Sequence, residues 1–406
     1  MKALILILLP LLVAFVGMSH QKRRLQPQGT LAEISNAHSP YLTTDPEGNL
    51  VMSWVSQCSN EEPALLKFAV SPDWGRSFRK AVTVPGSVGT GCAQGENPPK
   101  VALKAAGTII AVFRVDQPSE AHPHGGDVYT VSSTDGGQSW SSGQSLWGRN
   151  DRTQGFFDLK ILPDGEVGVL WVEEKAGPAG SGTSATIRFA KTQADHTFGP
   201  SLIISPSVCQ GCKVRLHVDS RNQIHTLFWK ILEEGAHDIA YSFSADNGSS
   251  FSSPRNVSPA RLVSDLCPES GPDLITFGKT MHVAWLAQGV QTGLYTTSTR
   301  NKRKKFTPRT LITESSKASN PSVTALPKGL QVFAWDEDVA QGDRVRKRKG
   351  VKTVDPNGNS FTCFLDSPED LVRPVVWGAD EKKVFVAYTK TDGDFFSVVF
   401  ESFQVM

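Results

Sequence analysis

One eight-residue pattern occurs three times in this chain, and it constrains the fold more than any other feature of the sequence. The copies span residues 71–78, 133–140 and 244–251, and each reads Ser-x-Asp-x-Gly-x-Ser followed by Phe or Trp. A single copy would carry little information, because Ser, Asp and Gly are common in turns of every kind. Three copies, each between two β-type runs, indicate a turn that the fold uses repeatedly.

The residue types of this pattern predict a rigid hairpin turn. The Asp carboxylate can accept hydrogen bonds from nearby backbone N–H groups. Gly adopts the positive φ that other residues resist, and the final aromatic ring can bury its apolar area beneath the turn. We therefore expect the central Asp and Gly of each copy to be structural, not catalytic. These residues are Asp73, Gly75, Asp135, Gly137, Asp246 and Gly248.

A longer repeat runs from about residue 30 to the end of the chain. Each of seven units contains a β-type strand that ends in an aromatic residue, preceded by a first strand with a polar turn and followed by two further strands. Four-stranded units repeated around an axis form a β-propeller. The strand-end aromatics, which we expect to be buried between units, follow one another at intervals of 50 to 59 residues: Trp54, Phe113, Trp171, Trp229, Trp285, Trp335 and Tyr388.

The eight-residue pattern resembles the Asp-box, or BNR repeat, of the sialidase-like β-propeller superfamily, and the resemblance covers nearly the whole chain. It implies an all-β fold of four-stranded antiparallel blades in a single domain, residues 30–406. Seven units predict seven blades; six, as in sialidases themselves, is the alternative. The last unit has only three strands, so we expect residues 30–34 to supply its fourth strand and leave no open sheet edge.

The resemblance also assigns two faces to the molecule. Asp-boxes mark the bottom face, whereas propellers usually place a ligand site on the upper face, at the mouth of the central channel. Charged and imidazole side chains that fall on the upper face are the candidates for binding a glycan or protein ligand. They are His38, Arg114, Glu120, His122, His124, Arg215 and His237.

Five of the six cysteines fall on the same predicted face, namely Cys58, Cys92, Cys209, Cys212 and Cys267. In an exported chain, the simplest interpretation is that they form disulfides, whose pairing the spacing does not determine. Cys209 and Cys212 also have the spacing of zinc ligands, so a Cys/His metal site is a weaker alternative. We expect no other cofactor. The sixth cysteine, Cys363, is expected to be a free or buried thiol on an outer strand.

Sialidases hold the sugar carboxylate with three Arg, and the first belongs to an Arg-Ile-Pro signature in the first strand. Here residues 37–41 read Ala-His-Ser-Pro-Tyr, with His38 in the Arg position, so no catalytic residue is carried over. A glycan- or protein-recognition module without standard sialidase catalysis is therefore the leading hypothesis. A glycoside hydrolase or lyase with its site at the channel mouth is the alternative, and it would need two converging carboxylates. Candidates in predicted upper loops are Asp116, Glu120, Glu173, Glu174, Glu233, Glu234, Asp336 and Glu337.

Residues 1–19 are predicted to be a signal peptide, because Lys2 precedes an apolar run, residues 3–16, that is short for a membrane span. Residues 20–29 are then a short linker, although the basic cluster at 22–24 leaves an uncleaved anchor as an alternative. We expect a mature chain without a membrane span, secreted, periplasmic or at the cell surface, and monomeric. A net charge of +2 gives no reason to expect a nucleic-acid partner.

Overall fold

The computed structural model describes residues 25–56, 64–87, 97–117, 125–146, 152–176, 183–208, 213–232, 237–257, 270–288, 292–300, 305–393 and 395–405. Strands dominate these ranges, and within them the only helical segments are two three-residue 3₁₀ turns, Ala105–Gly107 and Pro327–Gly329. Among these residues no helix is long and apolar enough to cross a membrane.

The strands pair into antiparallel groups of four, which we number as blades in chain order. Blade 1 consists of β2 (Ala37–Thr44), β3 (Leu50–Ser56), β4 (Leu66–Ser71) and β5 (Val82–Thr83). Blade 2 consists of β6 (Lys100–Leu103), β7 (Ile109–Asp116), β8 (Gly126–Ser133) and β9 (Gln144–Ser145). Blade 3 consists of β10 (Arg152–Ile161), β11 (Val167–Ala176), β12 (Thr183–Lys191) and β13 (Leu202–Val208). Blade 4 consists of β14 (Arg215–Val218), β15 (Ile224–Ile231), β16 (His237–Ser244) and β17 (Arg255–Asn256). Blade 5 consists of β18 (Asp273–Phe277), β19 (Thr280–Ala287), β20 (Gly293–Arg300) and β21 (Thr310–Leu311).

Two further groups complete the set. Blade 6 consists of β22 (Ala318–Leu326), β23 (Leu330–Gln341), β24 (Arg344–Val354) and β25 (Ser360–Leu365), and blade 7 of β26 (Asp370–Gly378), β27 (Lys383–Asp392), β28 (Phe395–Val405) and β1 (Leu25–Ser35). Blades 3 and 4 form one continuous eight-stranded sheet, but a single residue pair, Val208 with Lys230, joins them.

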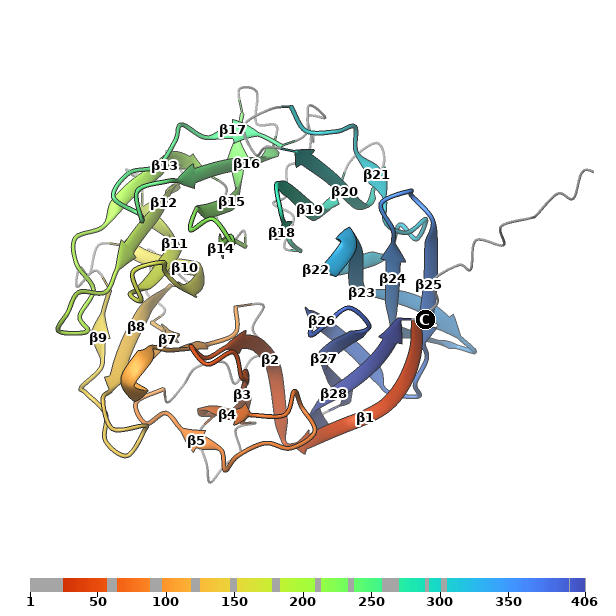
Figure 1. Ribbon diagram of the computed structural model, residues 1–406, viewed down its shortest axis with the longest axis horizontal. Helices are drawn as coiled ribbons and strands as arrows, with labels where there is room; N and C mark the ends of the chain where they lie inside the picture. Colours follow the sequence, from red (N-terminus) through yellow and green to blue (C-terminus); the bar gives the residue numbers. More distant parts are fainter. Residues whose placement is uncertain are drawn as a thin grey trace, which may run out of the picture.

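The blades stand in a ring around a central axis (Figure 1), with first strands such as β14, β18, β22 and β26 nearest the centre. Fourth strands such as β5, β9, β17 and β21 lie on the outside. This arrangement confirms the predicted all-β propeller of four-stranded antiparallel blades. The blade count of seven stays a prediction, which the grouping of the described strands favours over six.

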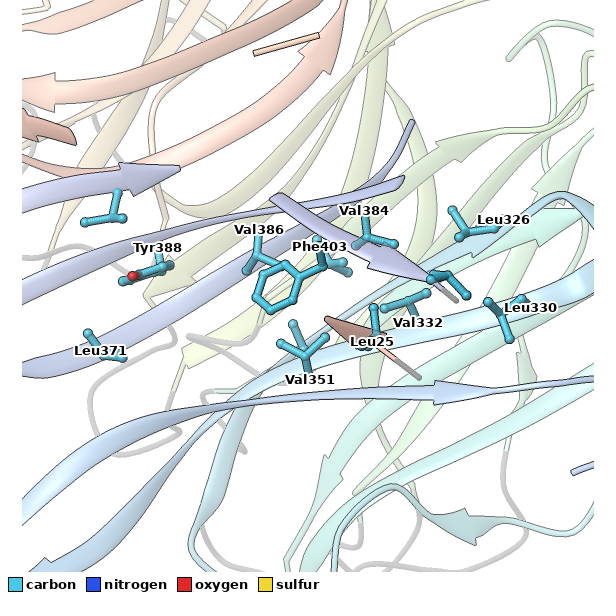
Figure 2. Close-up of a cluster of buried hydrophobic side chains, with 14 residues drawn as sticks. Leu25, Leu326, Leu330, Val332, Val351, Leu371, Val384, Val386, Tyr388 and Phe403 are labelled. Atoms are coloured by element: carbon cyan, nitrogen blue, oxygen red, sulfur yellow. The ribbon is translucent and has the colours of Figure 1, made fainter. Parts of the chain in front are cut away.

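The N-terminal strand closes the ring, as predicted from the three-stranded last unit. Strand β1 runs antiparallel to β28, with Ala32 opposite Phe400 and Ile34 opposite Val398. It begins at Leu25, inside the segment 20–29 that the sequence analysis treats as a linker. Leu25 reaches an apolar cluster between blades 6 and 7, where it lies near Val332, Val351, Val384 and Phe403 (Figure 2).

The strand-end aromatics of the repeat lie on the second strand of each blade, and all seven are buried, with at most 6% of each exposed. Burial follows from the architecture, because each sheet packs against a neighbouring sheet on both faces. Trp229 and Trp285, for example, share one apolar cluster between blades 4 and 5. These residues therefore form the core between blades, as the sequence analysis expects.

The three repeated turns, which we call box turns (residues 71–78, 133–140 and 244–251), share one hydrogen-bond pattern. In the first, Ser77 donates its backbone N–H to Asp73 Oδ1 at 2.8 Å and its hydroxyl to Oδ2 at 2.7 Å. The Gly75 N–H donates to Ser71 Oγ at 2.6 Å. A Cβ added at Gly75 would collide with Phe400 of blade 7, so glycine lets the turn press against the preceding blade.

Candidate functional site

A cavity of about 140 Å³ opens at the centre of the ring, where the first strands of the blades begin. Residues from all seven blades line it, so it lies on the channel axis and not between one pair of blades. We call this cavity the channel mouth. It lies toward the end of the blades opposite the box turns. In blade 1 its lining residues 39–41 lie between the Ala37–Ser56 pair at one end of the blade and the Thr44–Leu50 pair at the other, and Leu50 pairs with Ser71 of the first box turn.

One residue from each blade occupies an equivalent place in the mouth. Each lies on the first strand, and its pairing partner on the second strand is the residue directly before the strand-end aromatic. In blade 4 the partner is two residues before the aromatic. An apolar residue, proline in five blades, directly precedes each of them. We call this set the inner ring: Tyr41, Lys100, Asp158, Arg215, Asp273, Ser322 and Val375.

Inner-ring side chains bond to the next blade. Asp158 Oδ2 accepts the Leu216 N–H of blade 4 at 2.9 Å, and Asp273 Oδ2 accepts the Val323 N–H of blade 6, also at 2.9 Å. Ser322 Oγ accepts a backbone N–H of blade 7 at 3.1 Å. The ring therefore fastens neighbouring blades together at their inner edges, and its two carboxylates serve that purpose.

Arg215 joins the two carboxylates. Its Nε donates to Asp273 Oδ1 at 2.6 Å, and its Nη1 lies 3.6 Å from Asp158 Oδ2. Burial works against the charge of the Arg215 guanidinium, but the two carboxylates outweigh it and raise the pKa above its usual value. Burial would raise the pKa of Asp158, yet Arg215 and Lys100 hold it below the usual range. Arg215 and Asp158 are thus both charged at neutral pH.

The mouth carries more positive than negative charge. Four basic side chains line it (Lys100, Lys213, Arg215 and Arg373) and two carboxylates oppose them (Asp158 and Asp273), a formal surplus of two when Lys100 is protonated and of one when it is not. A surplus of fixed positive charge in a concave site attracts anions.

Lys100 is the most deeply buried of these cations. Its Nζ donates to the Phe157 carbonyl at 2.8 Å, lies 3.9 Å from Asp158 Oδ1 and sits 4.4 Å from the centre of the Phe157 ring. Burial lowers the pKa of Lys100 to about 7; Asp158 opposes that shift, whereas Arg215, Lys160 and Lys213 add to it. The amine therefore changes charge near neutral pH.

A buried carboxylate in blade 6 positions two mouth residues. Asp336, which is fully buried, accepts the Arg373 N–H at 2.7 Å and the Asn320 Nδ2 amide at 2.9 Å. Asn320 and Arg373 both have positive φ, of 49° and 53°, next to register shifts in their strands. Asn320 in turn accepts Lys213 Nζ at 3.1 Å. This network fixes where Lys213 and Arg373 enter the mouth.

Of the binding residues predicted from the sequence, only Arg215 is among the described residues that line the mouth. His38 is buried next to the lining residue Ser39, with its Nδ1 2.9 Å from Ser39 Oγ. Burial, and to a smaller extent Arg373, lower the pKa of His38 to about 4. The imidazole is therefore neutral at pH 7 and does not replace the charged arginine of sialidases. Arg114 pairs with Asp116 on β7, and His237 begins β16. Glu120, His122 and His124 lie outside the described residues.

The predicted disulfide and metal residues, Cys58, Cys92, Cys209, Cys212 and Cys267, also lie outside the described residues, so both interpretations stay predictions. Cys363 on β25 is a free thiol, as expected. In the part of the chain that the structure describes, no group of three or more His, Cys, Asp or Glu side chains could hold a metal ion.

Several carboxylates that the sequence places in upper loops instead lie on strands and have structural partners. Glu173 pairs with Arg188. Glu337 accepts Arg348 Nη2 at 2.7 Å and the Trp335 indole N–H at 2.9 Å. The sequence analysis missed the mouth residues Tyr41, Lys100, Asp158, Lys213, Asp273, Asn320 and Arg373. Aligning the first strands on their repeated Pro-x step would have placed Tyr41, Lys100 and Asp273 at one position, with Asn320 and Arg373 directly before the proline.

Comparisons with known proteins concern the fold. No protein-family model matches the sequence, and no curated protein is similar to it in sequence. The polysaccharide lyase Uly1 superposes with a TM-score of 0.53 at 12% identity, over 91% of this chain and 90% of that one. A Trypanosoma rangeli sialidase superposes with a TM-score of 0.45 at 12% identity, over 91% of this chain and 55% of the sialidase chain. The NanB sialidase of Streptococcus pneumoniae superposes with a TM-score of 0.46 at 11% identity, over 94% of this chain and 70% of the sialidase chain. At the level of the fold, the chain is a β-propeller that is similar to Uly1.

Proposed function

We propose that this protein is an exported recognition module that binds acidic glycans at the channel mouth, without sialidase catalysis. The observation that carries the proposal is the surplus of formal positive charge, one or two according to the protonation of Lys100, among the lining residues of a cavity on the propeller axis. Carboxylate and sulfate groups are the anionic groups of acidic glycans, and Lys and Arg bind them by charge-assisted hydrogen bonds.

The remaining lining of the mouth suits a sugar ring. Phe156 is half-buried, and prolines of five lining segments surround the charged groups, namely Pro40, Pro98, Pro272, Pro321 and Pro374. A pyranose has apolar C–H faces as well as hydroxyl groups, so a site of mixed apolar and charged residues fits it. Neutral ligands would leave the cation surplus uncompensated, and therefore bind more weakly.

The arrangement of the carboxylates supports binding over hydrolysis. A retaining or inverting glycosidase needs one carboxyl group as acid and another as nucleophile or base. In the mouth, Asp158 and Asp273 both accept backbone N–H groups and contact Arg215, and these contacts fix both carboxylates in the inter-blade ring. Neither is placed to deliver a proton to a leaving group.

The test is calorimetric titration of the protein with 3′-sialyllactose, an oligogalacturonate and a chondroitin sulfate oligosaccharide, with lactose as the neutral comparison. We expect Lys213→Gln and Arg373→Asn each to weaken binding of an acidic ligand about 10- to 100-fold, since a charge-assisted hydrogen bond contributes about 1.5–3 kcal/mol. Asn is chosen at Arg373 because it tolerates positive φ.

Arg344→Gln is the matched control, because Arg344 is exposed and begins strand β24, outside the lining of the mouth. The Arg344→Gln variant should bind the acidic ligands with the same affinity as the wild type. Mouth variants that bind the acidic ligands as tightly as the wild type does would contradict the proposal.

One observation favours a second candidate function, elimination on a uronic-acid polysaccharide. Lys100 lies in the mouth with a pKa of about 7, which suits a general base that removes a proton next to the sugar carboxylate. Such a lyase would generate an unsaturated product that absorbs in the ultraviolet. Steady accumulation of that product with the wild type, and none with Lys100→Met, would favour the lyase over a binding module.

A further inference from the structure

The first box turn differs from the other two at one position. Trp74 stands where the second and third turns have Gly136 and Asn247. All three residues have positive φ, of 57°, 73° and 57° respectively. Gly and Asn are the residues that tolerate this conformation, whereas a bulky side chain is strained there. The turn therefore carries a residue that its own backbone disfavours.

Core packing does not account for the choice. Trp74 is 37% exposed, whereas Trp171, Trp229 and Trp335 are at most 1% exposed. Trp74 is also the most exposed tryptophan among those that the structure describes. A strained, exposed aromatic residue at a surface turn is the kind of outlier from which a binding role is inferred.

Trp74 lines a cavity of about 370 Å³ between the first box turn and the lower end of blade 7. Two carboxylates and two cations share the lining with it, and these charges balance: Asp73, Arg76, Asp380 and Lys383. Ser402 of β28 adds a hydroxyl group. The cavity thus combines an aromatic face with several hydrogen-bond donors and acceptors and no net charge.

The framework of this cavity is firmly held. Asp73 is fixed by Ser71 and Ser77 within the box turn, and Asp380 accepts the N–H groups of Lys382 and Lys383 at 2.7 and 2.8 Å. Preformed sites of this kind bind ligands without a large ordering cost. The cavity also lies at the end of the blades opposite the channel mouth, so it is a separate site.

We propose that this lower-face cavity binds a neutral pyranose sugar, with Trp74 as the stacking platform. The indole face packs on the C–H face of the ring, while the charged side chains and Ser402 bind its hydroxyl groups. The balanced charge selects a neutral sugar, in contrast to the acidic ligand of the mouth. The inference does not depend on the proposed function of the mouth.

The experiment uses Trp74→Asn and Trp74→Gly in the full chain, which give the first turn the residues of its sister turns. Calorimetry and saturation-transfer NMR with lactose, maltose and cellobiose measure binding, and thermal unfolding measures stability. We expect at least one disaccharide to bind the wild type, and both variants to lose affinity 10-fold or more while their melting temperatures stay equal or rise. Trp74→Phe should retain part of the affinity.

Three results would overturn the inference: no binding of any disaccharide to the wild type, unchanged affinity in Trp74→Asn, or a melting temperature that falls in both variants, which would make Trp74 a packing residue. Lys213→Gln separates the two sites. It should leave disaccharide binding intact, just as Trp74→Asn should leave binding of 3′-sialyllactose at the mouth intact.

Discussion

Asp158, Arg215 and Asp273 show how one sequence position acquires different partners in successive blades. Each follows an apolar residue and lies on the first strand of its blade, and each reaches the next blade. Removing one partner of a buried ion pair costs far more than the pair contributes, because it leaves a charge unpaired in the interior. The inner ring is thus a structural device without net formal charge, and the proposed ligand site takes its surplus positive charge from Lys213 and Arg373 beside the ring.

Lys100 gives this account a pH dependence. Below pH 7 the folded protein holds a charged amine in its interior, which lowers the free energy of unfolding. Lys100 loses its proton near pH 7 in the folded protein, whereas in the unfolded chain it keeps the proton until about pH 10.4. The destabilisation is therefore relieved as the pH rises above 7. Unfolding therefore takes up a proton between these values. The unfolding free energy of the wild type, minus that of Lys100→Met, should rise by about 1.4 kcal/mol per pH unit in this window.

Urea denaturation at pH 6, 7, 8 and 9 measures that difference, and groups shared by the two proteins cancel in the subtraction. A difference that stays constant from pH 7 to 9 would show that Lys100 keeps its proton in the fold, contrary to this interpretation.

At the scale of elements, the box turns were predictable because their signal is local. Eight consecutive residues specify the hydrogen bonds, and the three copies place Asp73, Asp135 and Asp246 in the same geometry. The mouth was not predictable in this way. Its residues lie on strands whose register shifts near Ser39, Asn320 and Arg373 depend on buried partners such as Asp336, which are far away in the sequence.

Asp135 tests the structural role of the box turns. The Ser139 hydroxyl, the Ser139 N–H and then Ser133 hold the pKa of Asp135 below its usual value. A carboxylate with a depressed folded-state pKa stabilises the protein above its unfolded pKa of about 3.9, and the effect is lost as pH falls further. Asp135→Ala should lower the melting temperature by about 3 °C at pH 7, and by less at pH 3.

Asp195→Ala is the comparison variant, since that turn lacks the Gly and second Ser of the pattern. It should lower the melting temperature less. Equal melting temperatures for wild type and Asp135→Ala at pH 7 would contradict the structural role, as would a gap that widens in acid.

For the whole molecule, ring closure joins the two ends of the described chain. The sequence predicted that an N-terminal strand completes the last blade, because an unpaired edge on β28 would invite association. It did not predict that the strand begins at Leu25, since that depends on a cluster between blades 6 and 7 that only the assembled ring creates.

Leu25→Asp tests the closure. Leu25 is 3% exposed, so an unpaired carboxylate there should lower the free energy of unfolding by about 3 kcal/mol. Gln28→Asp, at an exposed position of the same strand, should change it by less than about 0.5 kcal/mol. Denaturant unfolding measures both; similar values for the two variants would mean that β1 contributes little to the ring.

A crystal structure of the protein with bound 3′-sialyllactose tests the central claim most directly. The account predicts the sugar carboxylate at the channel mouth, within hydrogen-bond distance of the side chains of Lys213 and Arg373, with the glycosidic bond intact. A mouth that stays empty at saturating ligand, whether or not sugar is bound at another surface, would contradict it.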